Sequence, residues 1–208
     1  MIAVAPTVLL VDDDASVRKS VTRLLEAAGY AVEAFASARD FLASEPHSGP
    51  CCLVLDVRMP GLTGLELQEA LTTAGRRMSI VFVTGHADVP MTVKAMKGGA
   101  LDLLTKPFDV EDLLKAVERA MKKDVKDRGD EAGLQEVRRR VEALTPRETE
   151  VFALVVTGML NKQIGAALGI EERTVKVHRA RVMEKMRAGS VAELVRLADR
   201  LGVIAPKS

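Results

Sequence analysis

Five polar residues stand directly after apolar runs in the first half of the chain, and together they could carry out phosphoryl chemistry. Asp12 and Asp13 follow the first run, and Asp56 follows the third. Thr84 and Lys106 follow the last two runs. Three carboxylates held close together repel one another unless a divalent cation neutralises them, and hard carboxylate oxygens suit Mg²⁺. With a hydroxyl and an ammonium added, the set matches what transfer of a phosphoryl group to an aspartate requires.

The elements that must position these residues are predicted from apolar runs that alternate with helical periodicity. Each short apolar run indicates a buried parallel strand, and the helices between the runs would cover both faces of one sheet. The predicted strands are Thr7–Val11, Ala31–Phe35, Cys52–Leu55, Ile80–Val83 and Leu101–Leu104. The first predicted helix has Ser16 as its N-cap and ends at Gly29. The other predicted helices are Ala38–Leu42, Leu65–Leu71, Pro90–Lys97 and Val110–Met121. Ligands of such sheets bind outside the carboxyl ends of the strands, where the five polar residues are expected.

Taken singly, these residues are weak indications of a site. An Asp after a strand is commonly a helix cap, and Lys106-Pro107 is compatible with an ordinary turn. The five residues nevertheless all fall at the ends of predicted strands that share one sheet edge. This convergence favours a common site over separate structural roles.

Residues 7–121 resemble the receiver domain of bacterial two-component response regulators, in register, through the segments VDDD, LDVRMPGLTGLEL, VTGHADV and LTKPF. The resemblance implies that Asp56 is the phosphoacceptor, that Thr84 is the hydroxyl that follows the phosphoryl group, and that Lys106 pairs with that group. It also implies a Mg²⁺ site, which would be formed by Asp12, Asp13, Asp56 and the backbone carbonyl of Arg58. The family usually has a cis peptide bond at the position of Lys106–Pro107.

One position departs from the receiver pattern. Leu103 stands three residues before the strand-end lysine, where many receivers carry an aromatic switch residue. Two alternatives stay open. In the first, Thr84 acts through Leu103 or through the helix at Val89–Lys97. In the second, the protein is a DNA-binding regulator that ignores phosphorylation and uses its first domain as a protein-interaction platform.

An enzymatic alternative is a phosphatase of the haloacid dehalogenase type, which also phosphorylates an aspartate. Such enzymes need a second Asp two residues after the first, and Arg58 stands at that position. The chain is therefore not expected to be an enzyme, beyond the Mg²⁺-dependent phosphorylation and dephosphorylation of its own Asp56.

From Thr145 onward the pattern is purely helical. Thr145 is a predicted N-cap, with Pro146 at the first helical position and Glu148 at the capping-box position. The first helix ends before Gly158, and the next three are predicted at Asn161–Leu168, Glu172–Arg187 and Val191–Leu201. Two short helices joined by a glycine turn are the signature of a helix-turn-helix.

The third of these helices carries the charge that DNA binding requires. Between Arg173 and Arg187 stand six basic residues and one acid, as phosphate neutralisation needs. Because Val175, Val182 and Met186 share the apolar stripe, the opposite side would face a major groove. The candidates for base contacts are Lys176, Val177 and Ala180, and those for phosphate contacts are Asn161, Lys162, Arg173, Thr174, Arg179 and Arg181. An isolated basic helix is as often a solvated face, but the four-helix pattern around it favours DNA binding.

Residues 145–203 resemble the LuxR/FixJ/NarL effector domain, so that the whole chain is similar to a FixJ-type response regulator. The expected fold class is α/β: a five-stranded parallel, doubly wound receiver domain of flavodoxin-like topology, followed by an all-α four-helix helix-turn-helix domain. The resemblance implies a transcription factor that a sensor histidine kinase activates by phosphorylation of Asp56. It further implies a homodimer that binds double-stranded promoter DNA, with RNA polymerase as another partner.

The net charge of +1 hides two oppositely charged halves. Residues 1–120 carry 12 Lys and Arg against 16 Asp and Glu, whereas residues 145–208 carry 11 against 7. Only the second half is therefore expected to meet a polyanion. The expected domains are residues 1–123 and 145–208, with a charged, helical linker at 124–144 between them.

The linker also contains a short apolar stripe, formed by Leu134, Val137, Val141 and Leu144. The expected role of this stripe is packing of the linker helix on its own domain, and the alternative is a dimer seam.

No segment of the sequence predicts membrane insertion or export. No apolar run approaches the length of about 20 residues that a membrane helix needs. The first fifteen residues lack a basic start and lead into an acidic cluster, unlike a signal peptide. Cys51 and Cys52 are adjacent, which is poor geometry for a disulfide. These features predict a cytoplasmic protein with no membrane partner.

Overall fold

The computed structural model describes residues 6–202, which form two compact units. The first unit comprises residues 1–128 and the second residues 129–208, including the ends outside the described range. The expected receiver domain lies within the first unit and the expected helix-turn-helix domain within the second. Residues 1–5 and 203–208 of those expected domains lie outside the described residues.

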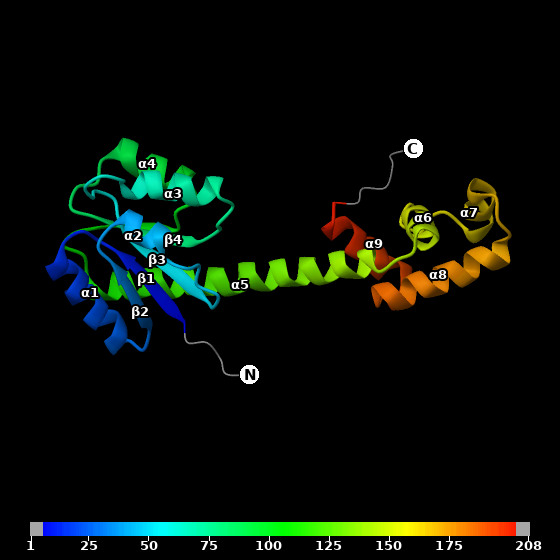
Figure 1. Ribbon diagram of the computed structural model, residues 1–208, viewed down its shortest axis with the longest axis horizontal. Coiled ribbons are helices and arrows are strands. Elements are labelled where there is room, and N and C mark those ends of the chain that lie inside the picture. The colour runs from blue at the N-terminus through cyan, green and yellow to red at the C-terminus, as the bar shows by residue number, and fades with distance from the viewer. Residues whose placement is uncertain (1–5, 203–208) are drawn as a thin grey trace. The chain divides into compact units, whose positions relative to one another are not determined.

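The first unit is built on a sheet of five parallel strands in the order β2-β1-β3-β4-β5. Figure 1 labels β1 to β4 of this sheet. The strands are β1 (Thr7–Val11), β2 (Ala31–Phe35), β3 (Cys51–Asp56), β4 (Ser79–Thr84) and β5 (Asp102–Thr105). The three central strands are apolar and buried along their length, as strands covered on both faces must be. The predicted parallel, doubly wound sheet is confirmed.

Helices cover both faces of this sheet. One face packs against α1 (Ala15–Ala27) and the first turns of α5 (Val110–Glu142). The other face packs against α2 (Ala38–Ala43), α3 (Gly64–Thr73) and α4 (Val89–Lys97). Both sets of contacts are apolar, so two cores lie back to back across the sheet and fix the strand ends in place.

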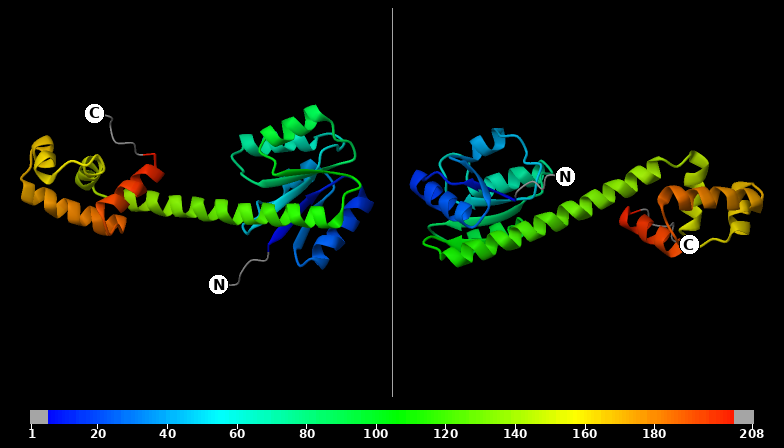
Figure 2. Two further views of the ribbon diagram at one scale, coloured as in Figure 1. Left: turned by 180° about the vertical axis from the view of Figure 1, so that it is seen from behind. Right: turned by 90° about the horizontal axis from the view of Figure 1, so that it is seen from below.

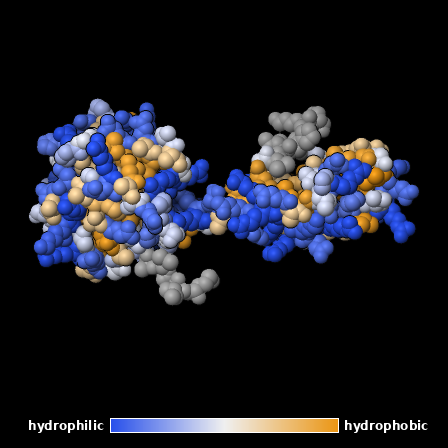
Figure 3. Space-filling view, viewed as in Figure 1, coloured by the Kyte–Doolittle hydropathy of each residue, from blue (hydrophilic) through white to orange (hydrophobic). Residues whose placement is uncertain are grey.

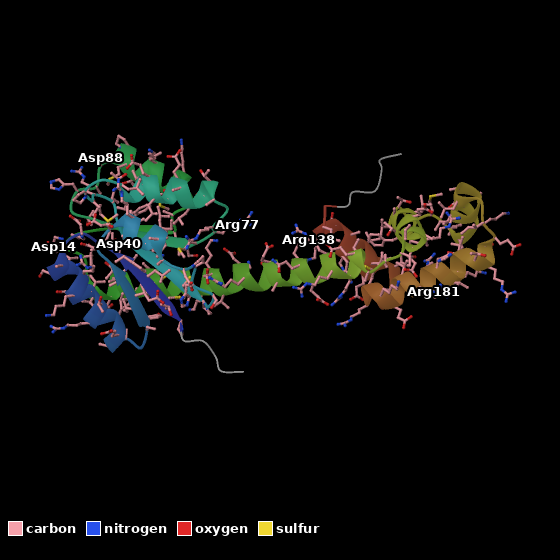
Figure 4. The ribbon with its side chains drawn as sticks, viewed as in Figure 1. Asp14, Asp40, Arg77, Asp88, Arg138 and Arg181 are labelled. Atoms are coloured by element: carbon pink, nitrogen blue, oxygen red, sulfur yellow. The ribbon has the colours of Figure 1, made fainter. Side chains whose placement is uncertain are left out.

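Short polar side chains begin the helices that follow β1, β3 and β4. Asp14, rather than Ser16, is the N-cap of α1, and its carboxylate accepts hydrogen bonds from the backbone N–H groups of Ser16 and Val17. The prediction of Ser16 was wrong because Asp14 stands one residue before the first helical turn, where its carboxylate satisfies two free N–H groups. Asp88 caps α4 in the same way, and Figure 4 labels both aspartates at these helix starts.

The prediction that the fifth helix ends at Met121 was wrong, because α5 is one helix of 33 residues. Figure 2 shows it uninterrupted from two further directions. Ion pairs one helical turn apart stabilise the charged stretch, between Glu118 and Lys122, Lys123 and Asp127, and Asp124 and Arg128. A glycine inside a helix lowers the stability of that helix by only about 1 kcal/mol relative to alanine. Gly129 and Gly133 therefore do not end α5. Figure 3 shows a predominantly hydrophilic surface along the middle of α5.

The second unit is helical. It contains the end of α5, followed by α6 (Pro146–Val155), α7 (Asn161–Leu168), α8 (Glu172–Met186) and α9 (Val191–Arg200). Thr145 and Glu148 form the predicted capping box at the start of α6. The predicted stripe of α8 is confirmed, since Val175, Val182 and Met186 are fully buried in the core of this unit.

Three residues of the predicted linker stripe, two on α5 and one just after it, belong to the same core, and the fourth, Leu134, is not among them. Val137 and Leu144 are buried there, and Val141 packs against the cluster. This agrees with the expectation that the helix packs on its own domain. Within residues 6–202, no helix combines the length and apolarity that crossing a membrane demands.

Candidate functional site: a carboxylate cluster and a helix-turn-helix surface

The sheet topology brings the predicted polar residues to one edge. β1 lies between β2 and β3, and its last residue, Val11, pairs with Leu55 of β3. The next residues along these two strands, Asp12 and Asp56, therefore emerge side by side. After β1 the chain continues to β2 on one side, and after β3 it continues to β4 on the other side. Open α/β sheets bind ligands at the strand ends where the connections diverge in this way. Thr84 ends the neighbouring strand β4.

Lys106 connects the two buried carboxylates of this edge. Its Nζ atom lies 2.6 Å from Oδ2 of Asp12 and 2.5 Å from Oδ2 of Asp56. The remaining oxygens accept backbone hydrogen bonds of 2.9 Å, Oδ1 of Asp12 from the N–H of Asp14 and Oδ1 of Asp56 from the N–H of Arg58. Each carboxylate is therefore held at both oxygens in a single orientation.

Burial and charge act against each other in this cluster. Asp12 is fully buried and Asp56 is only 7% exposed. Burial raises the pKa of Asp12 above its ordinary value, against the lowering effect of Lys106. Burial alone would lower the pKa of the Lys106 ammonium, but its hydrogen bonds to Asp12 and Asp56 leave that pKa raised. Lys106 is thus a positively charged counter-ion inside an acidic site.

The donor set fits a magnesium ion. Asp12, Asp13 and Asp56 each offer a carboxylate oxygen, and these oxygens lie within 4.8 Å of one another. Two of the three residues are buried and Asp13 is exposed, so a cation bound here would have protein oxygens on one side and water on the other. This is the arrangement that Mg²⁺ takes in proteins, since it keeps several water ligands. The backbone N–H of Arg58 contacts Asp56, so the carbonyl of the same residue belongs to a loop that lies beside the site.

Thr84 is fully buried at the end of β4. Its hydroxyl donates a 3.1 Å hydrogen bond to the backbone carbonyl of His86, and its own carbonyl accepts one of 2.7 Å from the N–H of Lys106. The peptide bond between Lys106 and Pro107 is cis. Leu103 is partly buried and packs against the core on the α3 and α4 side of the sheet.

Two residues of this site were not predicted from the sequence. Arg18, one helical turn after Asp14, donates a 2.7 Å hydrogen bond to the backbone carbonyl of Asp12. Gly64 begins α3 against the end of β3, where a Cβ atom would lie only 2.2 Å from the carbonyl oxygen of Asp56. Arg18 lies four residues after Asp14, and this spacing, which places both residues on one side of a helix, was the signal in the sequence that could have indicated it. The close approach at Gly64 has no signal in spacing, because it depends on how α3 packs.

The second unit presents the predicted DNA-contacting residues on α7 and α8. All are exposed except Asn161 and Arg179, which are partly buried; the exposed ones are Lys162, Arg173, Thr174, Lys176, Val177, Ala180 and Arg181. Figure 4 labels Arg181 on the outer surface of α8. Val177 is 47% exposed, which is unusual for an apolar side chain on a basic helix. A basic, exposed helix face with apolar side chains among the charges suits a DNA major groove.

Three of these residues take part in two contacts inside the protein. Lys176 forms an ion pair of 3.0 Å with Glu172, one turn earlier on α8. Arg179 donates a 2.8 Å hydrogen bond from Nη1 to the side-chain oxygen of Asn161, at the start of α7. The sequence did not predict this second contact, which joins residues that are far apart in the chain.

Comparison with known proteins agrees with this two-part architecture. Residues 8–118 match the family described as "Response regulator receiver domain", and residues 142–198 match "Bacterial regulatory proteins, luxR family". The carboxylate cluster lies in the first match and the basic helix face in the second.

Three similar proteins align with nearly the whole chain. Nodulation protein W of Bradyrhizobium diazoefficiens is 48% identical over 198 residues, which are 95% of this chain and 87% of that protein. The transcriptional regulatory protein FixJ of Azorhizobium caulinodans is 44% identical, over 93% of this chain and 92% of its own length. The solved structure of the response regulator StyR has a TM-score of 0.84 at 45% identity and covers 95% of this chain and 100% of that one.

A receiver fold with a carboxylate cluster, followed by a LuxR-type helix-turn-helix, makes a regulator rather than a metabolic enzyme. The chain belongs to the FixJ-like two-component response regulators, which join a receiver domain to a LuxR-type DNA-binding domain and regulate transcription.

Proposed function

We propose that Asp56 is the phosphoacceptor and that its phosphorylation by a sensor histidine kinase controls DNA binding. The observation that supports this most directly is the pair of short contacts from Lys106 to Asp12 and Asp56, in a cluster that also contains Asp13. Buried carboxylates of this density are costly unless they serve a charged ligand.

The chemistry is a transfer between two side chains. A carboxylate oxygen of Asp56 attacks the phosphorus of a phosphohistidine on the kinase, a P–O bond forms, and the P–N bond breaks. The electron pair of that bond returns to the imidazole of the kinase. Lys106, already beside Oδ2 of Asp56, neutralises the charge of the incoming phosphoryl oxygens. Thr84 holds a hydroxyl at the end of the next strand and donates to the phosphoryl group once it turns away from His86.

Magnesium would be held by Asp12, Asp13, Asp56 and the backbone carbonyl of Arg58. When bound, the ion supplies positive charge that offsets the negative charge on the phosphoryl group. Asp12 and Asp13 would hold the ion together with Asp56, and the backbone N–H of Arg58 keeps the Asp56 carboxylate from rotating.

The readout that we propose is formation of a homodimer through α4 and β5. Val89, Val93 and Met96 form an exposed apolar row on α4, at 76%, 44% and 45% exposure. Their spacing of four and three residues places them on one face of that helix. A small change in how α4 packs would alter this row, and a second copy of the chain would cover it.

The dimer binds double-stranded promoter DNA and acts there on RNA polymerase. Two copies of α8 reach paired half-sites, which multiplies the specificity of one short helix. Lys176, Val177 and Ala180 contact bases, and the other basic residues of α7 and α8 contact phosphates. Since both the kinase phosphohistidine and the promoter are in the cytoplasm, we place the protein there.

The direct test is labelling of the full chain by a small phosphodonor such as acetyl phosphate, with and without Mg²⁺. Wild type and the control Glu69→Gln, which changes an exposed carboxylate on α3, are expected to be labelled only when Mg²⁺ is present. Asp56→Ala is expected to lose the label and keep its circular dichroism spectrum. Equal labelling of Asp56→Ala and wild type would remove Asp56 from this role.

A further inference from the structure

The hydrogen bond between Arg179 and Asn161 indicates a role for Asn161 that does not require Asn161 itself to contact DNA. We propose that Asn161 is a positioning residue: its side-chain oxygen holds the Arg179 guanidinium, still charged, where that group neutralises one DNA phosphate. This inference rests on the proposed DNA binding by α7 and α8.

The position of Arg179 on its helix sets it apart from the other basic residues of α8. It lies four residues after Val175 and three before Val182, so it belongs to the stripe that faces the core, not to the opposite face. Arg173 and Arg181 are exposed, whereas Arg179 is partly buried. From this side of α8, the guanidinium of Arg179 extends to the start of α7, where its Nη1 contacts Asn161.

The identity of the partner explains how the charge is kept. In the part of the chain that the structure describes, the 2.8 Å bond to Asn161 is the only hydrogen bond of the Arg179 side chain, and no carboxylate pairs with it. An amide oxygen fixes the orientation of a guanidinium without neutralising its charge. By contrast, Lys176 on the same helix is paired with the carboxylate of Glu172. Arg179 is therefore held in place with its full charge and with N–H donors to spare.

Positioning of this kind raises affinity because it removes part of the entropy cost of ordering a long side chain on DNA. Arginine has a large rotamer freedom to lose, and a side chain that is already fixed in the free protein loses less on binding. Deletion of Asn161 should therefore weaken the Arg179 contact although no charge is removed.

The test measures the affinity of the full chain for a mixed-sequence double-stranded DNA fragment over a range of salt concentrations. For Arg179→Ala, we expect about a tenfold loss of affinity and a salt dependence that is weaker by about one phosphate contact. For Asn161→Ala, we expect a loss in the same direction in both quantities. The double variant Asn161→Ala/Arg179→Ala is expected to bind no more weakly than Arg179→Ala alone.

Arg181 provides the matched control, because it is an exposed arginine of the same helix and has no partner in the described residues. Asn161→Ala combined with Arg181→Ala is expected to show the sum of the two single effects. Asn161→Asp adds a second readout: it keeps an acceptor for Arg179, so thermal stability is unchanged or higher, but it neutralises the guanidinium and lowers DNA affinity.

Three outcomes would overturn the inference while leaving DNA binding intact. The first is an additive effect of Asn161→Ala in the Arg179→Ala background, which would mean that Asn161 contacts DNA independently. The second is a lower melting temperature for Asn161→Ala with unchanged salt dependence, which would mean a purely structural role. The third is full DNA affinity for Asn161→Asp. If wild type itself showed no salt-dependent binding, the proposed function would fail instead.

Discussion

Lys106 shares its ammonium between two carboxylates that arrive from different strands, and these two ion pairs dominate the electrostatics of the carboxylate cluster. One cation does not balance three carboxylates when Asp12, Asp13 and Asp56 are all ionised. This excess of negative charge would favour a divalent cation, and Lys106 offsets the repulsion between the two buried acids. The contacts of Lys106 therefore hold the carboxylates in an arrangement that would suit Mg²⁺.

Magnesium should therefore stabilise the folded protein, and Asp13 offers a way to test its site without disturbing the buried pair. At a concentration ten times its Kd, Mg²⁺ is expected to add about 1.4 kcal/mol to the free energy of unfolding. Asp13→Asn should lose most of this gain and be at least as stable as wild type without metal, because Asp13 is exposed and its charge adds only to the repulsion within the cluster. Thermal melts with Mg²⁺ and with a chelator measure both. An equal Mg²⁺ effect in wild type and Asp13→Asn would exclude Asp13 as a ligand.

At the scale of single residues, the sequence was sufficient to predict which carboxylates form the cluster, but not which hydrogen bonds the site residues make. Asp12 and Asp56 could be placed together because each stands directly after a predicted apolar strand, and the carboxyl ends of parallel strands share one edge of the sheet. The bridge from Lys106 and the bond between Arg179 and Asn161 could not be predicted, because each depends on side-chain packing between elements distant in the chain.

At the scale of the elements, the start of α3 shows how closely a helix can approach the site. A Cβ atom at Gly64 would overlap the backbone oxygen of Asp56, which cannot move without the strand. Gly64→Ala is expected to cost about 1–3 kcal/mol of folding stability and to slow phosphorylation of Asp56. Chemical denaturation and the labelling assay measure these two effects.

Gly129→Ala is the matched control for this substitution. Gly129 lies within α5, and a Cβ there would meet nothing within 4 Å. Since alanine is the better helix former, this change should stabilise the protein by about 1 kcal/mol and leave phosphorylation unchanged. A Gly64→Ala protein as stable and as active as wild type would show that α3 can shift without affecting the site.

The capping box of α6 makes a pH-dependent contribution to the second unit. Buried Glu148 lies 2.6 Å from Lys185 and accepts a hydrogen bond from the N–H of Thr145. These contacts lower the pKa of Glu148 from its ordinary value of 4.5 to about 2. A carboxyl whose pKa is lower in the folded state stabilises that state above its unfolded pKa, and the stabilisation is lost as the pH falls toward 2.

Glu148→Gln is therefore expected to be less stable than wild type above about pH 4.5, and the difference should shrink as the pH falls toward 2. Unfolding by denaturant at several pH values measures this difference. Glu150→Gln is the control, since Glu150 pairs with Arg147 at the surface and should show little difference at any pH. A Glu148→Gln deficit that did not change with pH would contradict the ionic origin of the effect.

Element boundaries could be predicted where local signals are strong. β1, β2 and α7 have the limits expected from their apolar runs and flanking residues. For α5, the helix Val110–Met121 and a helical linker at 124–144 were both predicted, but not that the two form one continuous helix. The ion pairs one turn apart and the packing of Val137 in the core of the second unit both favour the helical form of this stretch.

At the scale of the whole molecule, the two units separate two chemistries that need opposite charge. The acidic first half holds the carboxylates that would bind Mg²⁺ and accept a phosphoryl group, and the basic second half presents α8 to DNA. Under the proposed function a signal passes from the first unit to the second, and the exposed apolar row of α4 is where a second copy of the chain would bind. In this account, phosphorylation changes DNA affinity by changing the oligomeric state.

The most direct test of that account compares molecular mass and DNA affinity of the full chain with and without beryllofluoride, a phosphoryl mimic, in the presence of Mg²⁺. Wild type is expected to change from monomer to dimer on addition of the mimic and to bind DNA with paired half-sites more tightly. Asp56→Asn is expected to remain a monomer with the lower affinity under both conditions. A wild-type protein with the same mass and the same DNA affinity before and after addition would contradict control by phosphorylation.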